Sequence, residues 1–144
     1  MATERTGTAI WHGGLKDGKG TVSTQSGVLH NQGYTFVSRF ETGTGTNPEE
    51  LIAAAHTGCF SMALSAELEK AGHKGDHVDT TATVVLEFVA GAPTITTIHL
   101  VATAAVPGID DATFQQIATG AKANCPISRL LAAANITLQA TLKT

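Results

Sequence analysis

The strongest constraint on the fold is a long helix that begins after Asn47. Asn47 is a favourable N-cap residue, Pro48 suits the first helical position, and Glu50 follows the cap by three residues, as in a capping box. Small and apolar residues then recur every three or four positions to about Ala71, and Gly72 ends the pattern. A face of such small side chains lets the backbone of another element approach closely, as in the core of a small dimer or against a sheet.

Strand patterns, which are rich in β-branched and aromatic residues and bounded by turn residues, lie on both sides of this helix. They occur at residues 6–11, 20–25, 33–41, 78–89, 94–106 and 135–142. Two shorter helices are predicted before the last strand, one from Asp110 or Asp111 toward Ala123 and one that starts at Cys125-Pro126 and runs through Leu131. This order predicts an α+β fold with mostly antiparallel sheet and a hairpin between 78–89 and 94–106.

The strand pattern at 33–41 alternates between aromatic and polar positions. Tyr34, Phe36 and Phe40 fall on one face, and Arg39 falls on the opposite face. We therefore expect Arg39 to lie either in solvent or on a specific interface.

Length and composition limit the class of protein. A chain of 144 residues fits a single domain over 1–144, and a net charge of −3 disfavours nucleic acid or an anionic membrane as the main partner. No apolar run approaches the roughly 20 residues that span a bilayer, and the N-terminus lacks the apolar region of a signal peptide, so we expect a soluble cytoplasmic protein. Charged residues make up only 15% of the chain, against roughly 25% in average globular proteins, which suggests that an oligomer covers part of the surface.

The two cysteines, Cys59 and Cys125, allow three interpretations. They are a structural disulfide if the protein is secreted, a catalytic or oxidant-sensing pair in a reducing cytosol, or two buried thiols that never meet. Cys59 lies inside the long helix, where a packed core thiol is common. Cys125 precedes Pro126 at a helix start, where free N–H groups and the helix dipole stabilise a thiolate. Whether the two sulfurs are close depends on how the helices pack, which the sequence leaves open.

Three polar residues of the long helix are further candidates. The capping box explains Glu50 but does not need Glu49. On one straight helix Glu49 and Cys59 would be about 15 Å apart, so either the helix breaks between them or Glu49 serves Cys59 of a neighbouring chain. His56, three residues before Cys59, fits a packing or interface histidine, and it also fits a Cys-His nucleophile pair.

Two segments carry a resemblance to a known family. Residues 45–62, with Asn47-Pro48-Glu49-Glu50 at the helix start, and residues 123–128, with Cys125-Pro126, closely resemble the osmotically inducible protein C (OsmC) family of thiol peroxidases, and specifically its OsmC branch. Residues 18–24 and 106–110 also match, so the resemblance covers essentially the whole chain.

This resemblance implies a cysteine-based peroxidase of oxidative and osmotic stress defence that prefers organic hydroperoxides to hydrogen peroxide. Cys59 matches the peroxidatic cysteine and Cys125 the resolving cysteine. Arg39 matches the arginine that the OsmC branch carries on its third strand, and Glu49 matches the glutamate after the Asn-Pro pair. Arg39 is expected to activate the Cys59 thiolate, and Glu49 to hold Arg39 through a bidentate pair. Arg5 lies nearer the N-terminus, as in the related organic hydroperoxide resistance branch, but its surroundings do not match.

The resemblance also implies an intertwined homodimer with active sites at the subunit interface, so Arg39 and Glu49 are expected to reach Cys59 of the other chain. A sulfenic acid on Cys59 would become a Cys59–Cys125 disulfide, which an external dithiol of the lipoyl type would reduce. No metal, haem or flavin is needed. The alternatives are an oxidant sensor or hydrophobic-ligand-binding protein of the same fold, and a hydrolase that uses Cys59 and His56.

Overall fold

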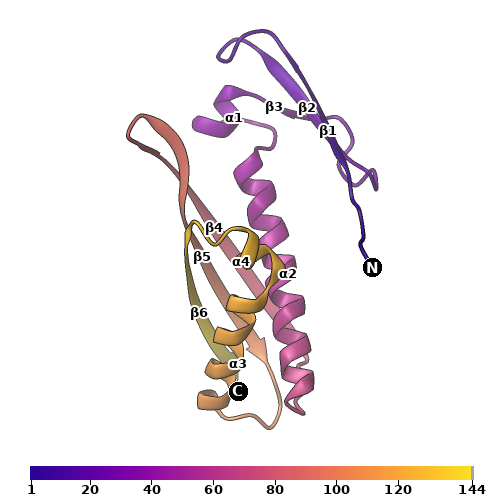
Figure 1. The fold of residues 1–144 in the computed structure, drawn as a ribbon, viewed down its shortest axis with the longest axis vertical. Helices are drawn as coiled ribbons and strands as arrows, with labels where there is room; N and C mark the ends of the chain where they lie inside the picture. The colour runs from indigo at the N-terminus through magenta and orange to yellow at the C-terminus, as the bar shows by residue number, and fades with distance from the viewer. Residues whose placement is uncertain (144) are drawn as a thin grey trace. The chain divides into compact units, whose positions relative to one another are not determined.

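The computed structural model describes residues 1–143 and divides the chain into two units, Met1–Leu51 and a second unit from Ile52 onward (Figure 1). The first unit contains an antiparallel sheet of three neighbouring strands, β1 (Gly7–His12), β2 (Lys19–Thr24) and β3 (Gln32–Tyr34). The strands predicted at 6–11 and 20–25 are thus confirmed to within one residue. The prediction of a single domain over 1–144 stays a prediction.

The strand predicted at 33–41 is wrong beyond Tyr34, because the chain turns there into the short helix α1 (Phe36–Phe40). The Thr35 hydroxyl accepts from the Ser38 N–H at 3.1 Å, and the Ser38 hydroxyl accepts from the Thr35 N–H at 2.8 Å. These reciprocal hydrogen bonds form a capping box and start a helix, although the alternation of the side chains favours a strand. Arg39 therefore lies on α1, with its guanidinium over the Phe40 ring at 5.2 Å, and not on a strand face opposite the aromatic residues.

The long helix is α2 (Pro48–Lys70), and its predicted ends are confirmed. At the start, Asn47 Oδ1 accepts from the Glu50 N–H at 2.7 Å. The Glu50 carboxylate accepts from the Thr46 hydroxyl at 2.8 Å, where a full capping box would use the Asn47 N–H. Gly72 ends the helix with φ +86°, a left-handed conformation that glycine adopts without steric cost.

The second unit contains a sheet with the strand order β4 (His77–Val89), β5 (Ala92–Ala105), β6 (Asn135–Lys143). β4 and β5 form the predicted hairpin, joined by Ala90 and Gly91, both at positive φ as a tight two-residue turn requires. β6 pairs with β5 in parallel, so the sheet is mixed where the sequence predicts mostly antiparallel pairing. The helices α3 (Asp111–Asn124) and α4 (Pro126–Leu130) complete this unit.

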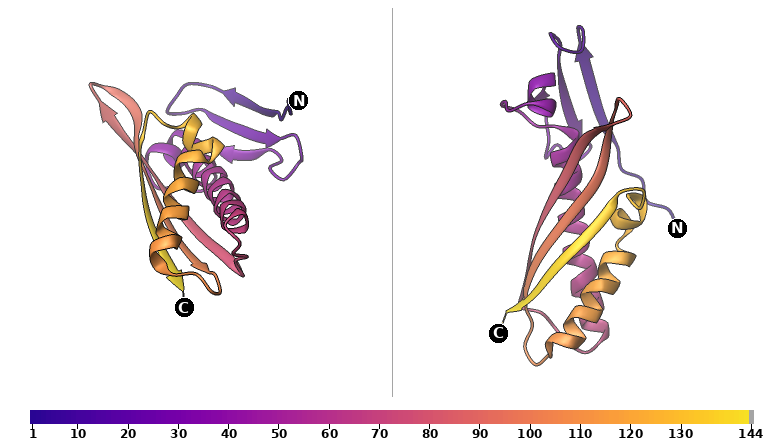
Figure 2. Two further views of the ribbon diagram at one scale, coloured as in Figure 1. Left: turned by 60° about the horizontal axis from the view of Figure 1, so that its bottom comes forward. Right: turned by 90° about the vertical axis from the view of Figure 1, so that its left-hand side faces the viewer.

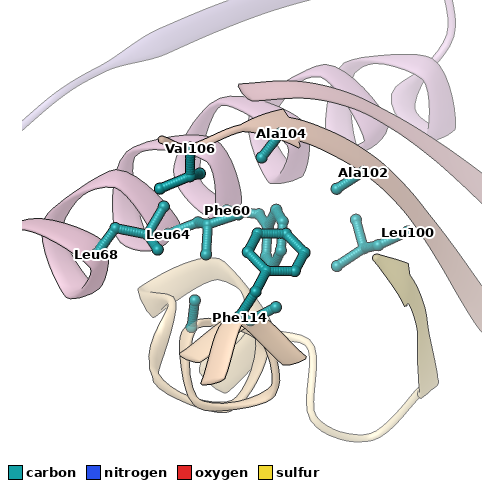
Figure 3. Packing of buried hydrophobic residues seen from close by; sticks show 10 residues of the cluster. Phe60, Leu64, Leu68, Leu100, Ala102, Ala104, Val106 and Phe114 are labelled. Carbon is teal, nitrogen blue, oxygen red and sulfur yellow. The ribbon is translucent and has the colours of Figure 1, made fainter. Parts of the chain in front are cut away.

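Both α2 and α3 pack on one face of this sheet (Figures 1 and 2). Alternate β5 residues are buried and the residues between them are more exposed, so one side of the strand faces the helices. Figure 3 shows Phe60 of α2 and Phe114 of α3 within the resulting core. Its buried members are Phe60, Leu64, Leu68, Leu100, Ala102, Ala104, Val106, Phe114, Ala118 and Ala121.

Among residues 1–143, α2 is the one helix long and apolar enough to cross a membrane, judged by length and composition alone. The expectation that no segment approaches that length is wrong by this measure. A core helix of a soluble protein meets the same test, and α2 places Phe60, Leu64 and Leu68 in the core. Only 22% of the apolar 18-residue stretch of α2 is buried within one chain, so much of α2 is uncovered. The exposed positions between Ala54 and Ala66 are Ala54, Ala55, Gly58, Met62, Ser65 and Ala66.

Candidate active site

Cys59 and Cys125 are brought together in the second unit. Cys59 lies within α2 and is partly exposed, whereas Cys125 lies between α3 and α4 and is fully buried. Both are free thiols, and they lie close enough that the Cys125 side chain contributes to raising the pKa of Cys59. The interpretation in which the two thiols never meet does not hold.

Cys125 is both the C-cap of α3 and the N-cap of α4. Its N–H donates to the Ala121 carbonyl, and its carbonyl accepts from the Arg129 N–H, each at 3.0 Å. Pro126 occupies the first position of α4, where an N–H would have no hydrogen-bond partner within the helix. The Cys125 side chain makes no capping bond, so the N–H groups of the first turn stay available, and the N–H of Ile127 donates to the Cys59 sulfur.

The pKa of the Cys59 thiol is raised above its ordinary value within one chain. Burial is the largest cause, because desolvation disfavours the thiolate, and the hydrogen bond with Cys125 acts in the same direction. The Ile127 N–H opposes them by stabilising the thiolate. Formation of a reactive thiolate at neutral pH therefore calls for a further positive charge near Cys59.

His56 lies one helical turn before Cys59 and is fully buried. Its Nε2 is 2.7 Å from the Ser128 hydroxyl on α4, and its Nδ1 is buried with no hydrogen-bond partner among the described residues. Burial lowers the pKa of His56, so the ring is neutral at neutral pH. Because Nε2 is bonded to Ser128, the geometry favours the packing interpretation of His56 over a Cys-His nucleophile pair.

Arg39 and Glu49 form an ion pair inside the first unit. Arg39 Nη2 is 2.9 Å from Glu49 Oε1, and Arg39 Nε is 3.3 Å from each carboxylate oxygen. The Glu49 side chain is 10% exposed and that of Arg39 is 38% exposed, so the guanidinium keeps a face open to solvent while its partner is covered. The expected bidentate contact is thus present, although it is made from α1 and not from the third strand.

The helix α2 has no break between Glu49 and Cys59. At the usual rise per residue, the ten positions between them span about 15 Å along the axis. The continuous helix assignment favours the second of the two possibilities for Glu49, service to Cys59 of a neighbouring chain, which stays a prediction. Glu50, by contrast, is occupied by the cap at Asn47 and Thr46, which accounts for it without a role in chemistry.

Two groups beside the cysteines are absent from the sequence-based site. They are the N–H of Ile127 and the hydroxyl of Ser128. The sequence contains a signal for each group. The Cys125-Pro126 helix start leaves the next N–H groups, including that of Ile127, without partners in the helix. Ser128 follows Cys125 by three residues, the same spacing by which His56 precedes Cys59.

Outside the pair of thiols, the described residues form surface clefts but no cluster of metal ligands. Among residues 1–143, no three His, Cys, Asp or Glu side chains gather as a metal ion would require. The first unit has a mainly apolar cleft between its sheet and the start of α2, lined by Ala9, Val22, Tyr34, Thr46, Asn47, Pro48 and Leu51.

Comparison with known proteins gives consistent matches along the chain. Residues 41–141 match the family described as OsmC-like protein. The proteins named peroxiredoxin OsmC from Escherichia coli (strain K12) and from Shigella flexneri are each 54% identical over 143 residues, which covers 99% of this chain and 99% of theirs. The solved structure of the organic hydroperoxide resistance protein OhrB of Bacillus subtilis aligns with a TM-score of 0.70 and 26% identity over 96% of this chain and 98% of its own.

Proposed function

The chain belongs to the OsmC family, and we propose that it is a cysteine-based peroxidase that reduces organic hydroperoxides to alcohols. The observation that carries the proposal is the pair of neighbouring free thiols, of which Cys59 is partly exposed and Cys125 is buried. An exposed thiol can meet a peroxide, and a second thiol in contact with it can close a disulfide.

The proposed reaction has two steps on the protein. The Cys59 thiolate attacks the terminal oxygen of the hydroperoxide, the O–O bond breaks, and the alkoxide takes up a proton and leaves as the alcohol. Cys59 is then a sulfenic acid, and the Cys125 thiol attacks its sulfur, so that an S–S bond forms and the oxygen leaves as water. The two thiols supply the two electrons, and no prosthetic group takes part.

An external dithiol completes the cycle. Its thiolate attacks the Cys59–Cys125 disulfide, its second thiol releases the mixed disulfide, and both protein thiols are restored while the dithiol becomes a disulfide. We propose a dithiol of the lipoyl type. Since Cys125 is buried and Cys59 is partly exposed, the reductant is expected to attack the Cys59 sulfur first.

We propose that the charge activating Cys59 comes from a second copy of the chain. On one straight helix Glu49, which holds Arg39, would stand about 15 Å from Cys59, whereas a charge shifts a pKa strongly only within about 4–6 Å. The uncovered face of α2 around Gly58 and Met62 gives a second copy an apolar surface to cover. A homodimer in which Arg39 and Glu49 of one chain face Cys59 of the other accounts for both features.

The apolar cleft belongs to the same unit as Arg39 and Glu49, and we propose that in the dimer it receives the alkyl group of an organic peroxide. Its lining side chains, which include Val22, Tyr34 and Leu51, suit an alkyl group better than the small, polar hydrogen peroxide.

The test is steady-state consumption of tert-butyl hydroperoxide with dihydrolipoamide, combined with mass spectrometry after one equivalent of peroxide. The wild type should consume the peroxide and form a Cys59–Cys125 disulfide. Cys59→Ser should abolish both, and Cys125→Ser should complete the first oxidation but lose recycling. A wild type that takes up one oxidising equivalent and never turns over would point to a sensor, and a fully active Cys59→Ser variant would exclude the proposed chemistry.

A further inference from the structure

A buried polar pair beside the two cysteines has no part in the proposed chemistry. His56 Nε2 and Ser128 Oγ are 2.7 Å apart, and the two residues are 0% and 4% exposed. The pair joins α2, which carries Cys59, to α4, whose N-cap is Cys125. It therefore connects the same two helices as the thiols do.

Each cysteine has one residue of the polar pair three positions away, in opposite chain directions on the two helices. His56 precedes Cys59 by three residues, and Ser128 follows Cys125 by three. Residues three apart lie on the same side of a helix, so the His56–Ser128 bond secures the side of α4 that faces Cys59. Ser128 also directly follows Ile127, whose N–H donates to the Cys59 sulfur.

The helix α4 depends on contacts of this kind. It has five residues, far fewer than an isolated helix needs for stability in water, and its N-cap side chain forms no capping bond. Both groups that contact the Cys59 sulfur, the Cys125 side chain and the Ile127 N–H, sit at the start of this short helix. A small rotation of its first turn would move both groups away from Cys59.

Burial makes the His56–Ser128 bond costly to lose. In an apolar interior, a polar group left without its partner keeps the full penalty of desolvation. The unpartnered Nδ1 also indicates the tautomer, because a bare ring nitrogen costs less to bury unpaired than an N–H does. On this ground we assign the proton of His56 to Nε2, whose N–H then donates a hydrogen bond to the Ser128 hydroxyl oxygen.

We infer that His56 and Ser128 are positioning residues for the disulfide step, and that their hydrogen bond keeps Cys125 within reach of the Cys59 sulfur. The inference rests on the proposed function in one respect, since it takes Cys59 and Cys125 as the reacting pair. Without the bond, Cys125 samples more positions and the sulfenic acid on Cys59 lasts longer. A second peroxide molecule then oxidises Cys59 to the sulfinic acid in place of disulfide formation.

The first measurement is the equilibrium of the protein thiols with oxidised dithiothreitol, which gives the protein disulfide and reduced dithiothreitol. The matched variants are His56→Leu and His56→Gln, because both side chains have a similar size and only glutamine keeps a polar end. His56→Leu and Ser128→Ala should each lower the equilibrium constant for the disulfide by about fivefold to tenfold, the fold-change that corresponds to one buried hydrogen bond. His56→Gln should recover most of it.

The second measurement is the product ratio after a small excess of tert-butyl hydroperoxide without a dithiol, read by mass spectrometry. His56→Leu and Ser128→Ala should shift the products from disulfide toward Cys59 sulfinic acid. The control is Ser61→Ala, which removes the 2.8 Å bond between Ser61 of α2 and Thr80 of β4 and leaves α4 untouched. It should change neither the equilibrium nor the product ratio.

The double variant His56→Leu/Ser128→Ala separates positioning from folding. Removing both polar partners leaves nothing unpaired, so this variant should fold even where a single change impairs folding, and its disulfide should be no weaker than in the single variants. Equilibrium constants within twofold of the wild type in all folded variants, or an equal loss in Ser61→Ala, would overturn the inference. The equilibrium needs no peroxidase activity, so a wild type that consumed no peroxide would refute the proposed function and leave this test intact.

Discussion

The Arg39 guanidinium contacts the Glu49 carboxylate through two of its nitrogens, with Nη2 at 2.9 Å from Oε1 and Nε at 3.3 Å from both oxygens. This contact through two nitrogens fixes the orientation of the planar guanidinium. A lysine has a single ammonium nitrogen and could not make the same two-point contact. If Arg39 presents its charge to Cys59 of a second copy, its orientation matters as well as its charge.

Arg39→Lys is expected to slow the oxidation of Cys59 although the charge is kept. A lysine held less firmly near the sulfur lowers the thiolate fraction, and a loss of one pKa unit of stabilisation corresponds to about tenfold in rate at neutral pH. Stopped-flow measurement of the first oxidation by tert-butyl hydroperoxide gives the rate. Arg5→Lys is the matched control and should react like the wild type, and equal rates in all three proteins would contradict the role of Arg39.

Cys125→Ala is expected to lower the pKa of Cys59. The hydrogen bond and the charge interaction with Cys125 both raise the pKa of Cys59, so removing the side chain removes both effects, while burial, the largest cause, remains. Alkylation of Cys59 by iodoacetamide, followed by peptide mass spectrometry over a pH series, should therefore reach half its maximal rate at a lower pH in Cys125→Ala than in the wild type. A midpoint that stays in place or rises would contradict the contact between the two thiols.

Asn47→Ala is expected to destabilise the folded chain by about 1 kcal/mol, the usual cost of losing a helix N-cap. Asn47 Oδ1 accepts from the Glu50 N–H, and Asn47 Nδ2 donates to the Ser38 carbonyl at 2.9 Å. Asn47→Asp keeps the cap acceptor and loses only the donor, so it should retain more stability than Asn47→Ala. Urea unfolding of the reduced protein compares the stability of the wild type, Asn47→Ala and Asn47→Asp. A loss of stability in Asn47→Asp as large as in Asn47→Ala would mean that the hydrogen bond to the Ser38 carbonyl, and not the helix cap, accounts for the effect.

Local signals account for what the sequence predicts well. The start of α2 at Asn47-Pro48, its end at Gly72 and the β4–β5 hairpin all depend on residues next to one another in the chain, so the sequence reveals them. The error at 33–41 is also local in origin. A period of two in the side chains favours a strand, but the paired hydrogen bonds of Thr35 and Ser38 start a helix at the same place.

The candidate site could be predicted only in part, because it depends on tertiary packing. The contact between Cys59 and Cys125 arises because α3 packs on α2 through Phe114 and Phe60, and α4 follows α3 without a linker. The spacing of Cys59 and Cys125 in the sequence does not reveal this packing. The bond between His56 and Ser128 is hidden for the same reason.

His56 is expected to make the folded state less stable in acid. Burial lowers the pKa of His56 in the folded chain, whereas in the unfolded chain it titrates near 6.5. As the pH falls below about 6.5, the unfolded chain gains a proton that the folded chain does not, so the free energy of unfolding falls by up to about 1.4 kcal/mol per pH unit until the folded pKa is reached. Urea unfolding should show a smaller decrease in His56→Gln than in the wild type, while His30→Gln, which replaces an exposed histidine, should follow the wild type. Identical pH dependence in all three proteins would mean that His56 is protonated as readily in the folded chain as in the unfolded one.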